Sequence, residues 1–212
     1  IGNSTKKEDI NAIGKFGVGF KSVYAVTSTP VIKSGEFDIT IKDFVLPQIN
    51  LYKEKHKDTR IILEFKHKFR SAAEIYEKTR SRLEAFEMET LLFLNSIKEI
   101  KIDYENDYKI YSKTVKNYNK NRKGYFLVKL SGDVSESYLL AVRLFEIDGK
   151  QLETKVALKV RYDETGSLEL VPAAKSSKLT VFFPTNEETY MRCLIHAPFK
   201  TTPSRDNVPF ND

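Results

Sequence analysis

The stretch Ala12–Val26, AIGKFGVGFKSVYAV, places three glycines within six residues. Glycine loses more conformational freedom on folding than any other residue, so a loop that merely joins two elements seldom needs so many. From Phe20 to Thr27, residues of one helical face recur at spacings of three and four, which predicts a helix of about two turns before Pro30 ends it. The free N–H groups at the start of such a helix would point back toward the glycines. The stretch therefore favours binding of an anionic group such as phosphate.

Two common phosphate-binding patterns fit these glycines poorly. Gly14 and Gly19 have the spacing of a Walker A loop, but Phe20 separates Gly19 from Lys21 and Ser22. An inserted residue changes the direction in which the lysine leaves the loop. The dinucleotide-binding pattern needs a strand before its glycines, and residues 12–16 are not a predicted strand. A purely structural role stays open, because glycines permit tight turns and close helix packing.

The segment 14–26, GKFGVGFKSVYAV, resembles the glycine-rich lid of the GHKL ATPases, the superfamily of gyrase, the ninety-kilodalton heat-shock chaperones, histidine kinases and MutL. Within that superfamily it is most similar to the heat-shock-chaperone and sacsin-like branch, and the opening IGNSTKKED is similar to the stretch before the lid in sacsin-like proteins. The segment DTRIILEF, residues 58–65, resembles a strand whose threonine helps to hold adenine, although Asp58 replaces the usual glycine. The last 32 residues, from Val181, resemble the closing segment of sacsin-like ATPase regions.

The resemblance implies a set of nucleotide-binding residues and one catalytic residue. In the lid, backbone N–H groups would hold the phosphates, with Lys15 or Lys21 adding charge. Ser204-Arg205-Asp206 resembles a chaperone loop in which the arginine reaches the γ-phosphate, so Arg205 is the catalytic candidate. The implied nucleotide-binding residues are Gly14, Lys15, Phe16, Gly17, Val18, Gly19, Phe20, Lys21 and Thr59.

Other parts that the resemblance requires have no counterpart in the sequence. The family places a water-activating glutamate, a Mg²⁺-binding asparagine and an adenine-binding Asp-x-Gly-x-Gly segment before the lid. We therefore expect that this chain is a fragment that lacks the N-terminal half of an ATP site. The full-length protein is expected to be an ATPase that uses ATP and Mg²⁺, and the fragment alone is expected to be inactive. No metal site is predicted, because Cys193 and His196 would lie on opposite faces of a strand.

The predicted fold class is α+β. Residues 1–96 would form an incomplete GHKL-type α/β sandwich, the C-terminal part of the ATP-binding domain with its lid. Residues 97–212 would form a β-rich, mainly antiparallel, middle or transducer-like region. In the first part, alternation predicts strands at 37–42, closed by Pro47, and at 59–65, and the capping box Ser71/Glu74 predicts a long helix from about Ala72. In the second part, predicted strands lie at 100–104, 108–115, 125–130, 138–147, 154–162 and 179–183.

Composition adds little to the functional argument. The net charge is +6, but 29 acidic residues are mixed among 35 basic ones. The stretch Lys113–Lys129 holds no acidic residue, which predicts a solvated hairpin loop or, as the alternative function, a non-enzymatic basic module that binds nucleic acid. The longest apolar run has five residues, too few for a membrane span, and a single cysteine favours a cytoplasmic location. Expected partners are ATP and a protein client or a second copy.

Overall fold

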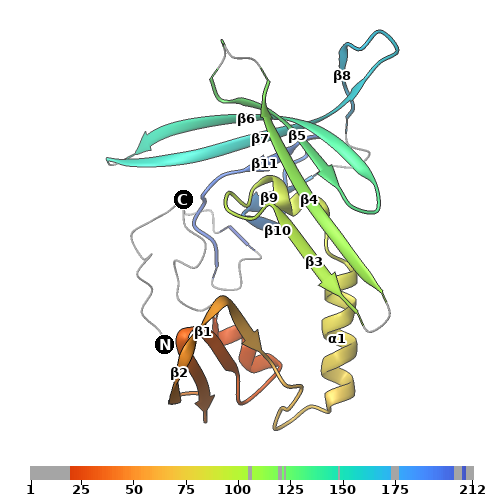
Figure 1. Cartoon of the computed structure of the whole chain (residues 1–212). Helices are drawn as coiled ribbons and strands as arrows, with labels where there is room; N and C mark the ends of the chain where they lie inside the picture. The colour runs from red at the N-terminus through yellow and green to blue at the C-terminus, as the bar shows by residue number, and fades with distance from the viewer. Residues whose placement is uncertain are drawn as a thin grey trace. The chain divides into compact units, whose positions relative to one another are not determined.

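The computed structural model describes residues 20–104, 107–118, 121, 123–147, 149–172, 177–202 and 207–208, with the backbone alone at 52–54 (Figure 1). The chain divides into two compact units, Ile1–Phe86 and Glu87–Asp212. The change in residue pattern along the sequence predicted the boundary between the two parts at residues 96 and 97 instead. The difference arises because the short 3₁₀ helix η2, Met88–Leu92, packs on strands β4 and β5 of the second unit.

The first described element is the 3₁₀ helix η1, Phe20–Ala25. The predicted helix of about two turns is present as this six-residue 3₁₀ helix, which ends before Thr27. The side chain of Thr27 is fully buried, and its hydroxyl accepts a hydrogen bond from the N–H of Thr29 at 3.3 Å. This local bond competes with continued helical hydrogen bonding. The predicted helix is therefore shorter and more tightly wound than its residue spacing indicated.

A two-stranded antiparallel sheet follows, formed by β1, Val31–Lys42, and β2, Leu46–Ile62. The turn between them holds Asp43 and Phe44 at φ values of 49° and 66°, and Gly35 has φ 54° where the register shifts. The prediction that Pro47 closes the strand region was wrong, since Pro47 pairs with Ile41 near the start of β2. Proline is tolerated there because, among the residues that the structure describes, neither strand pairs with another strand on its outer side.

The helix α1, Ala72–Glu84, confirms the predicted capping box. The Ser71 hydroxyl accepts from the Glu74 N–H at 3.2 Å, and the Glu74 carboxylate accepts from the Ser71 N–H at 2.8 Å. Two otherwise unpaired donors at the helix start are thereby satisfied. Ile75 is the one buried residue of the helix, so most of α1 faces solvent.

The second unit is built on a nine-stranded sheet, which confirms the predicted β-rich and mainly antiparallel second part. The strand order is β10-β9-β11-β7-β6-β5-β4-β3, with β8 paired to β7, and the β11–β9 pair is parallel. The strands are β3 Glu99–Asp103, β4 Tyr108–Asn117, β5 Tyr125–Ser131, β6 Ser135–Ile147, β7 Lys150–Tyr162, β8 Leu168–Leu170, β9 Lys178–Val181, β10 Phe183–Glu188 and β11 Leu194–His196.

The core of this unit lies between one sheet face and the segment around η2. Leu91 and Phe93 are at most 1% exposed, as are Val128 and Leu130 two positions apart on β5. Residues two apart on a strand share a face, so Val128 and Leu130 point to the same side of the sheet. Burial of such side chains supplies most of the free energy that holds η2 against the strands.

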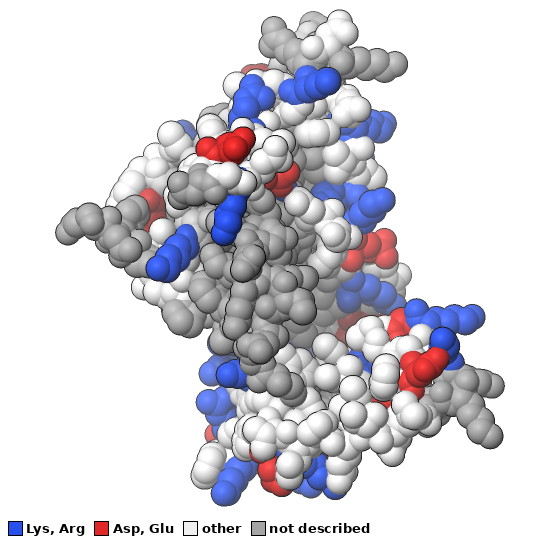
Figure 2. Space-filling model, turned by 90° about the vertical axis from the view of Figure 1, so that its left-hand side faces the viewer, with Lys and Arg blue, Asp and Glu red and all other residues white. Residues whose placement is uncertain are grey.

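The predicted basic stretch does not form one solvated loop. Lys113 lies in β4 and is only partly exposed, and its ammonium group donates hydrogen bonds to main-chain carbonyl groups. Lys116 and Lys129 are exposed on β4 and β5. On the face drawn in Figure 2, basic side chains are interspersed with acidic ones rather than gathered in one patch. Among the described residues, no helix is long and apolar enough to cross a membrane.

A buried histidine makes the second unit sensitive to acid. His196 is 2% exposed, its ring stacks on Phe93 at 5.3 Å, and its Nδ1 accepts from the Phe182 N–H at 3.1 Å. Burial, helped by the charge of Lys155, lowers the pKa of His196 to about 4. Because the folded pKa lies below the ordinary value of 6.5, the neutral ring stabilises the fold above pH 6.5, and that contribution is lost as the pH falls toward 4.

We therefore expect the free energy of unfolding of the second unit to fall by about 3 kcal/mol between pH 7 and pH 4 through this residue. Nuclear magnetic resonance (NMR) titration of the His196 imidazole gives the folded-state pKa directly, and denaturant unfolding at several pH values gives the free energy. A His196 pKa near its ordinary value would contradict the burial argument.

Candidate functional site

Most of the sequence-predicted site lies outside the described residues. This is so for Gly14, Lys15, Phe16, Gly17, Val18, Gly19 and Arg205. Phe20, Lys21 and Thr59 are described, and they lie on two elements of the first unit, η1 and β2.

The short helix η1 is anchored to the turn between β1 and β2. The Tyr24 hydroxyl donates to the Phe44 carbonyl at 3.0 Å, and the two rings lie edge to face with centroids 4.8 Å apart. Phe20 packs against Tyr24 from one turn earlier, at 6.2 Å between centroids. Lys21 lies on the same helix and is exposed. The chain that leaves the glycine-rich segment is thus held at a fixed place on the hairpin.

The residue pattern predicted that Thr59 begins a strand. In the structure Thr59 lies inside β2 instead. Its side chain is exposed, and its Oγ1 is 2.7 Å from the Ser34 Oγ on β1. Its neighbours Asp58 and Arg60 form an ion pair at 3.1 Å. Within the described part of the chain, no hydrogen bond or ion pair joins Thr59 to Phe20 or Lys21, and their shared role in a nucleotide site stays a prediction.

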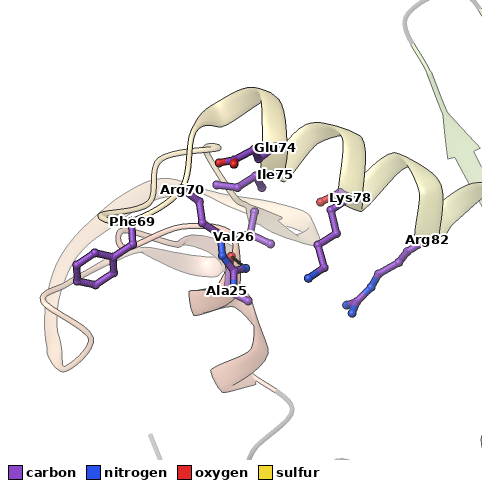
Figure 3. Close-up of a pocket in the computed structure, with 9 residues that line it drawn as sticks. Ala25, Val26, Phe69, Arg70, Glu74, Ile75, Lys78 and Arg82 are labelled. Atoms are coloured by element: carbon purple, nitrogen blue, oxygen red, sulfur yellow. Dashed lines mark hydrogen bonds between the residues drawn. The ribbon is translucent and has the colours of Figure 1, made fainter.

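A cavity of about 410 Å³ lies beside the end of η1, between Ala25 and Val26 and the helix α1 (Figure 3). Three cationic side chains line it: Arg70, Lys78 and Arg82. Ile75 contributes the buried apolar part of the wall.

The cations of this cavity differ in how they are held. The Arg70 guanidinium donates to the Ala25 carbonyl at 3.3 Å, which ties the entrance of α1 to the end of η1. Lys78 and Arg82 are four residues apart and extend from the same side of α1 (Figure 3). Neither forms an ion pair within the described part of the chain. The pair is therefore available to a ligand.

Among the described residues that line the cavity, Glu74 is the one carboxylate, and it does not neutralise that pair. Glu74 accepts from both the N–H and the hydroxyl of Ser71, at 2.8 and 3.0 Å. These bonds to Ser71, and the charge of Arg70, lower the pKa of Glu74, so its charge is engaged at the helix start. The remaining positive groups give the cavity the chemistry of an anion site, with guanidinium and ammonium donors suited to phosphate or carboxylate.

The cavity was missed by our sequence reasoning, although a signal was present. Lys78 and Arg82 have the spacing that places two side chains on one helix face. The proximity of Arg70 to Ala25, 45 positions away in the sequence, carries no such signal. Among the described residues, no group of three or more His, Cys, Asp or Glu side chains could hold a metal ion.

Comparison with known proteins finds that the first part of the chain is similar to one kind of domain. The family model described as the Sacsin domain matches residues 1–89. Human sacsin is 41% identical over 58 residues, which make up 27% of this chain and 1% of that protein. The chain thus corresponds to a very small part of the length of the curated relative that it matches. No solved structure matches the chain.

Residues 1–89 are therefore sacsin-like. The matched range contains the glycine-rich segment, Lys21, Thr59 and every residue that lines the cavity beside η1.

Proposed function

We propose that the first unit is the lid-bearing part of an ATP site in a sacsin-like protein of the GHKL class. The observation that carries this proposal is the Sacsin-domain match over residues 1–89, because that range contains the glycine-rich segment. Backbone N–H groups from Gly14 to Phe20 bind the phosphates of ATP, and Lys15 or Lys21 adds positive charge. Thr59 contributes to the adenine side of the site.

The basic cavity beside η1 supports an anionic ligand in this unit. Tyr24 fixes η1 on the hairpin turn, and η1 is the element that joins the glycine-rich segment in sequence to Ala25 and Val26 at the cavity. Lys78 and Arg82 line the same cavity without an ion pair among the described residues. They increase the positive potential at the exit of the lid and attract the triphosphate.

Hydrolysis needs parts that these 212 residues do not contain. In the complete protein, the residues that would bind Mg²⁺ and activate water belong to sequence outside this chain, and that sequence completes the GHKL-type sandwich. Arg205 stabilises charge on the γ-phosphate, and the β-rich second unit acts as the middle or transducer-like region. A protein client or a second copy is the protein partner. The 212-residue chain alone releases no phosphate from ATP.

Substitution of Lys78 and Arg82 by alanine is expected to weaken Mg·ATP binding by the complete protein about tenfold, since two exposed charges near a polyanion together contribute on the order of 1.4 kcal/mol. Isothermal calorimetry measures this change. Arg80→Ala is the matched control, because Arg80 lies on the same helix and pairs with Glu84 at 2.8 Å instead of lining the cavity. Equal affinities for the double variant and the control would remove the cavity from the proposal.

A further inference from the structure

A second cavity, of about 260 Å³, lies over strands β4 to β7 of the second unit. Its apolar wall includes Val115, Phe126 and Val142, one from each of three neighbouring strands. Val115 is 51% exposed, so the cavity opens to solvent there. A mostly apolar hollow with a few polar groups is the usual form of a small-molecule site.

The first polar group of this cavity is Lys113. Its ammonium donates to the carbonyls of Leu91 and Leu94, at 2.7 and 2.6 Å. An ammonium group has three N–H donors, so these bonds account for two of them. No carboxylate pairs with Lys113 in the described ranges. Burial, together with the charge of Lys155 nearby, lowers the pKa of Lys113 to about 8.

The second polar group is Lys155, which is 4% exposed. Its ammonium pairs with the Glu153 carboxylate at 2.8 Å and donates to the Asn95 side-chain oxygen. Although burial acts in the opposite direction, hydrogen bonds from Lys155 and Asn95 lower the pKa of Glu153 and keep it charged. These two bonds likewise account for two of the three donors of Lys155.

The charges of the cavity do not balance. Among the described residues that line it, two ammonium groups face one carboxylate, which leaves one positive charge in a partly desolvated, largely apolar space. A buried charge of this kind is stabilised by an anion. A single negative charge suffices, and Glu153 repels a doubly charged phosphate. The small volume and the apolar wall favour a short hydrocarbon chain beside that charge.

We infer that this cavity binds a small organic carboxylate. Its short aliphatic chain lies against Val115, Phe126 and Val142, and its carboxylate accepts hydrogen bonds from Lys113 and Lys155. This assignment uses only residues of the second unit and is independent of the proposed ATP site.

Titration of the 212-residue chain with butyrate, followed by NMR of its side chains, tests the inference. We expect saturable shifts of the Val115 and Val142 methyl signals. Lys113→Met is expected to weaken butyrate about tenfold, because a charge-assisted hydrogen bond is lost. Lys116→Met is the matched control on the same strand and leaves binding unchanged, since Lys116 does not line the cavity. Butylamine, similar in size and opposite in charge, causes no saturable shift.

A second variant covers the case in which Lys113→Met does not fold. Val115→Phe fills the open side of the cavity and abolishes butyrate binding with both lysines in place, whereas Val156→Phe, outside the cavity, does not. If butyrate causes no saturable shift in the wild-type chain, or binds Val115→Phe as well as wild type, the inference is wrong.

The pH dependence adds a readout that a merely structural Lys113 would not produce. Raising the pH from 7 to 9 is expected to weaken butyrate about tenfold, as Lys113 loses its proton near pH 8. The other titratable groups that line the cavity among the described residues are Lys155 and Glu153 on β7, and His196 on β11 interacts with both of them. Glu153 and His196 have lowered pKa values and do not change charge in this range. An equal pH dependence in Lys113→Met would overturn the role of Lys113.

Discussion

Simultaneous replacement of Gly17 and Gly19 by alanine is expected to abolish ATP binding by the complete protein. In the proposed lid, main-chain N–H groups approach the phosphates closely, and glycine permits both that approach and the left-handed backbone conformations that such loops use. Each Cβ that is added displaces a phosphate contact, and a charge-assisted hydrogen bond is worth roughly 1.5–3 kcal/mol. Two such losses weaken binding at least about a hundredfold, which calorimetry with Mg²⁺ present detects as the absence of heat.

Gly166→Ala serves as the control for this double variant. Gly166 has φ 80° in an exposed turn after β7, so alanine there introduces backbone strain at a position outside the lid sequence. It should leave ATP affinity unchanged. The alternative function, a basic module that binds nucleic acid, predicts a different result. In that case the wild type binds no ATP, and the Gly17/Gly19 variant keeps the nucleic-acid affinity of the wild type and its salt dependence.

The second large effect is expected from Phe93→Ala, which should lower the free energy of unfolding of the second unit by about 3–5 kcal/mol. Phe93 is 1% exposed and stacks on the buried ring of His196 at 5.3 Å, with 20° between the ring planes. Its removal leaves a cavity beside that ring and admits water to it. The folded-state pKa of His196 should therefore rise toward its ordinary value. Denaturant unfolding and NMR titration of His196 measure the two consequences.

Phe69→Ala is the matched control, because Phe69 is 82% exposed and its loss should change the unfolding free energy by less than about 0.5 kcal/mol. The coupling of the two readouts is the sharper test. If Phe93→Ala destabilised the chain but left the pKa of His196 unchanged, the Phe93 ring would not be the group that excludes water from His196.

The features that could be predicted from sequence are those that act within a few residues. The capping box of α1 depends on Ser71 and Glu74 alone, and it formed as expected. The end of η1 could not be predicted, because it depends on the burial of Thr27 and on the contact between Tyr24 and Phe44, 20 positions away. Local spacing carries no information about such tertiary contacts.

The long strand β2 was missed for a related reason. Its middle, near residues 48–58, lacks the alternation of a half-buried strand and was predicted as a charged loop. The structure shows that side chains such as Gln48, Ile49 and Leu51 are exposed there. Because the side chains at 46–51 are exposed whichever face they point to, this part of β2 needs no alternation, and the sequence pattern does not reveal the strand.

In the candidate sites too, features set by local spacing could be predicted from the sequence, and features set by tertiary contacts could not. The shared helix face of Lys78 and Arg82 can be deduced from their spacing, whereas their position beside Ala25 requires the fold. Lys113 belongs to the stretch Lys113–Lys129, which the sequence predicted as a solvated hairpin loop. In the structure it lines a cavity and donates to Leu91 and Leu94, because a strand turns alternate side chains toward the covered face.

The most direct measurement of the central claim is a calorimetric titration of the complete protein with ATP in the presence of Mg²⁺. The account predicts saturable binding that the Gly17→Ala, Gly19→Ala variant lacks, together with no phosphate release by the 212-residue chain on its own. Absence of binding by the folded, complete protein, or ATP turnover by the present chain alone, would contradict it.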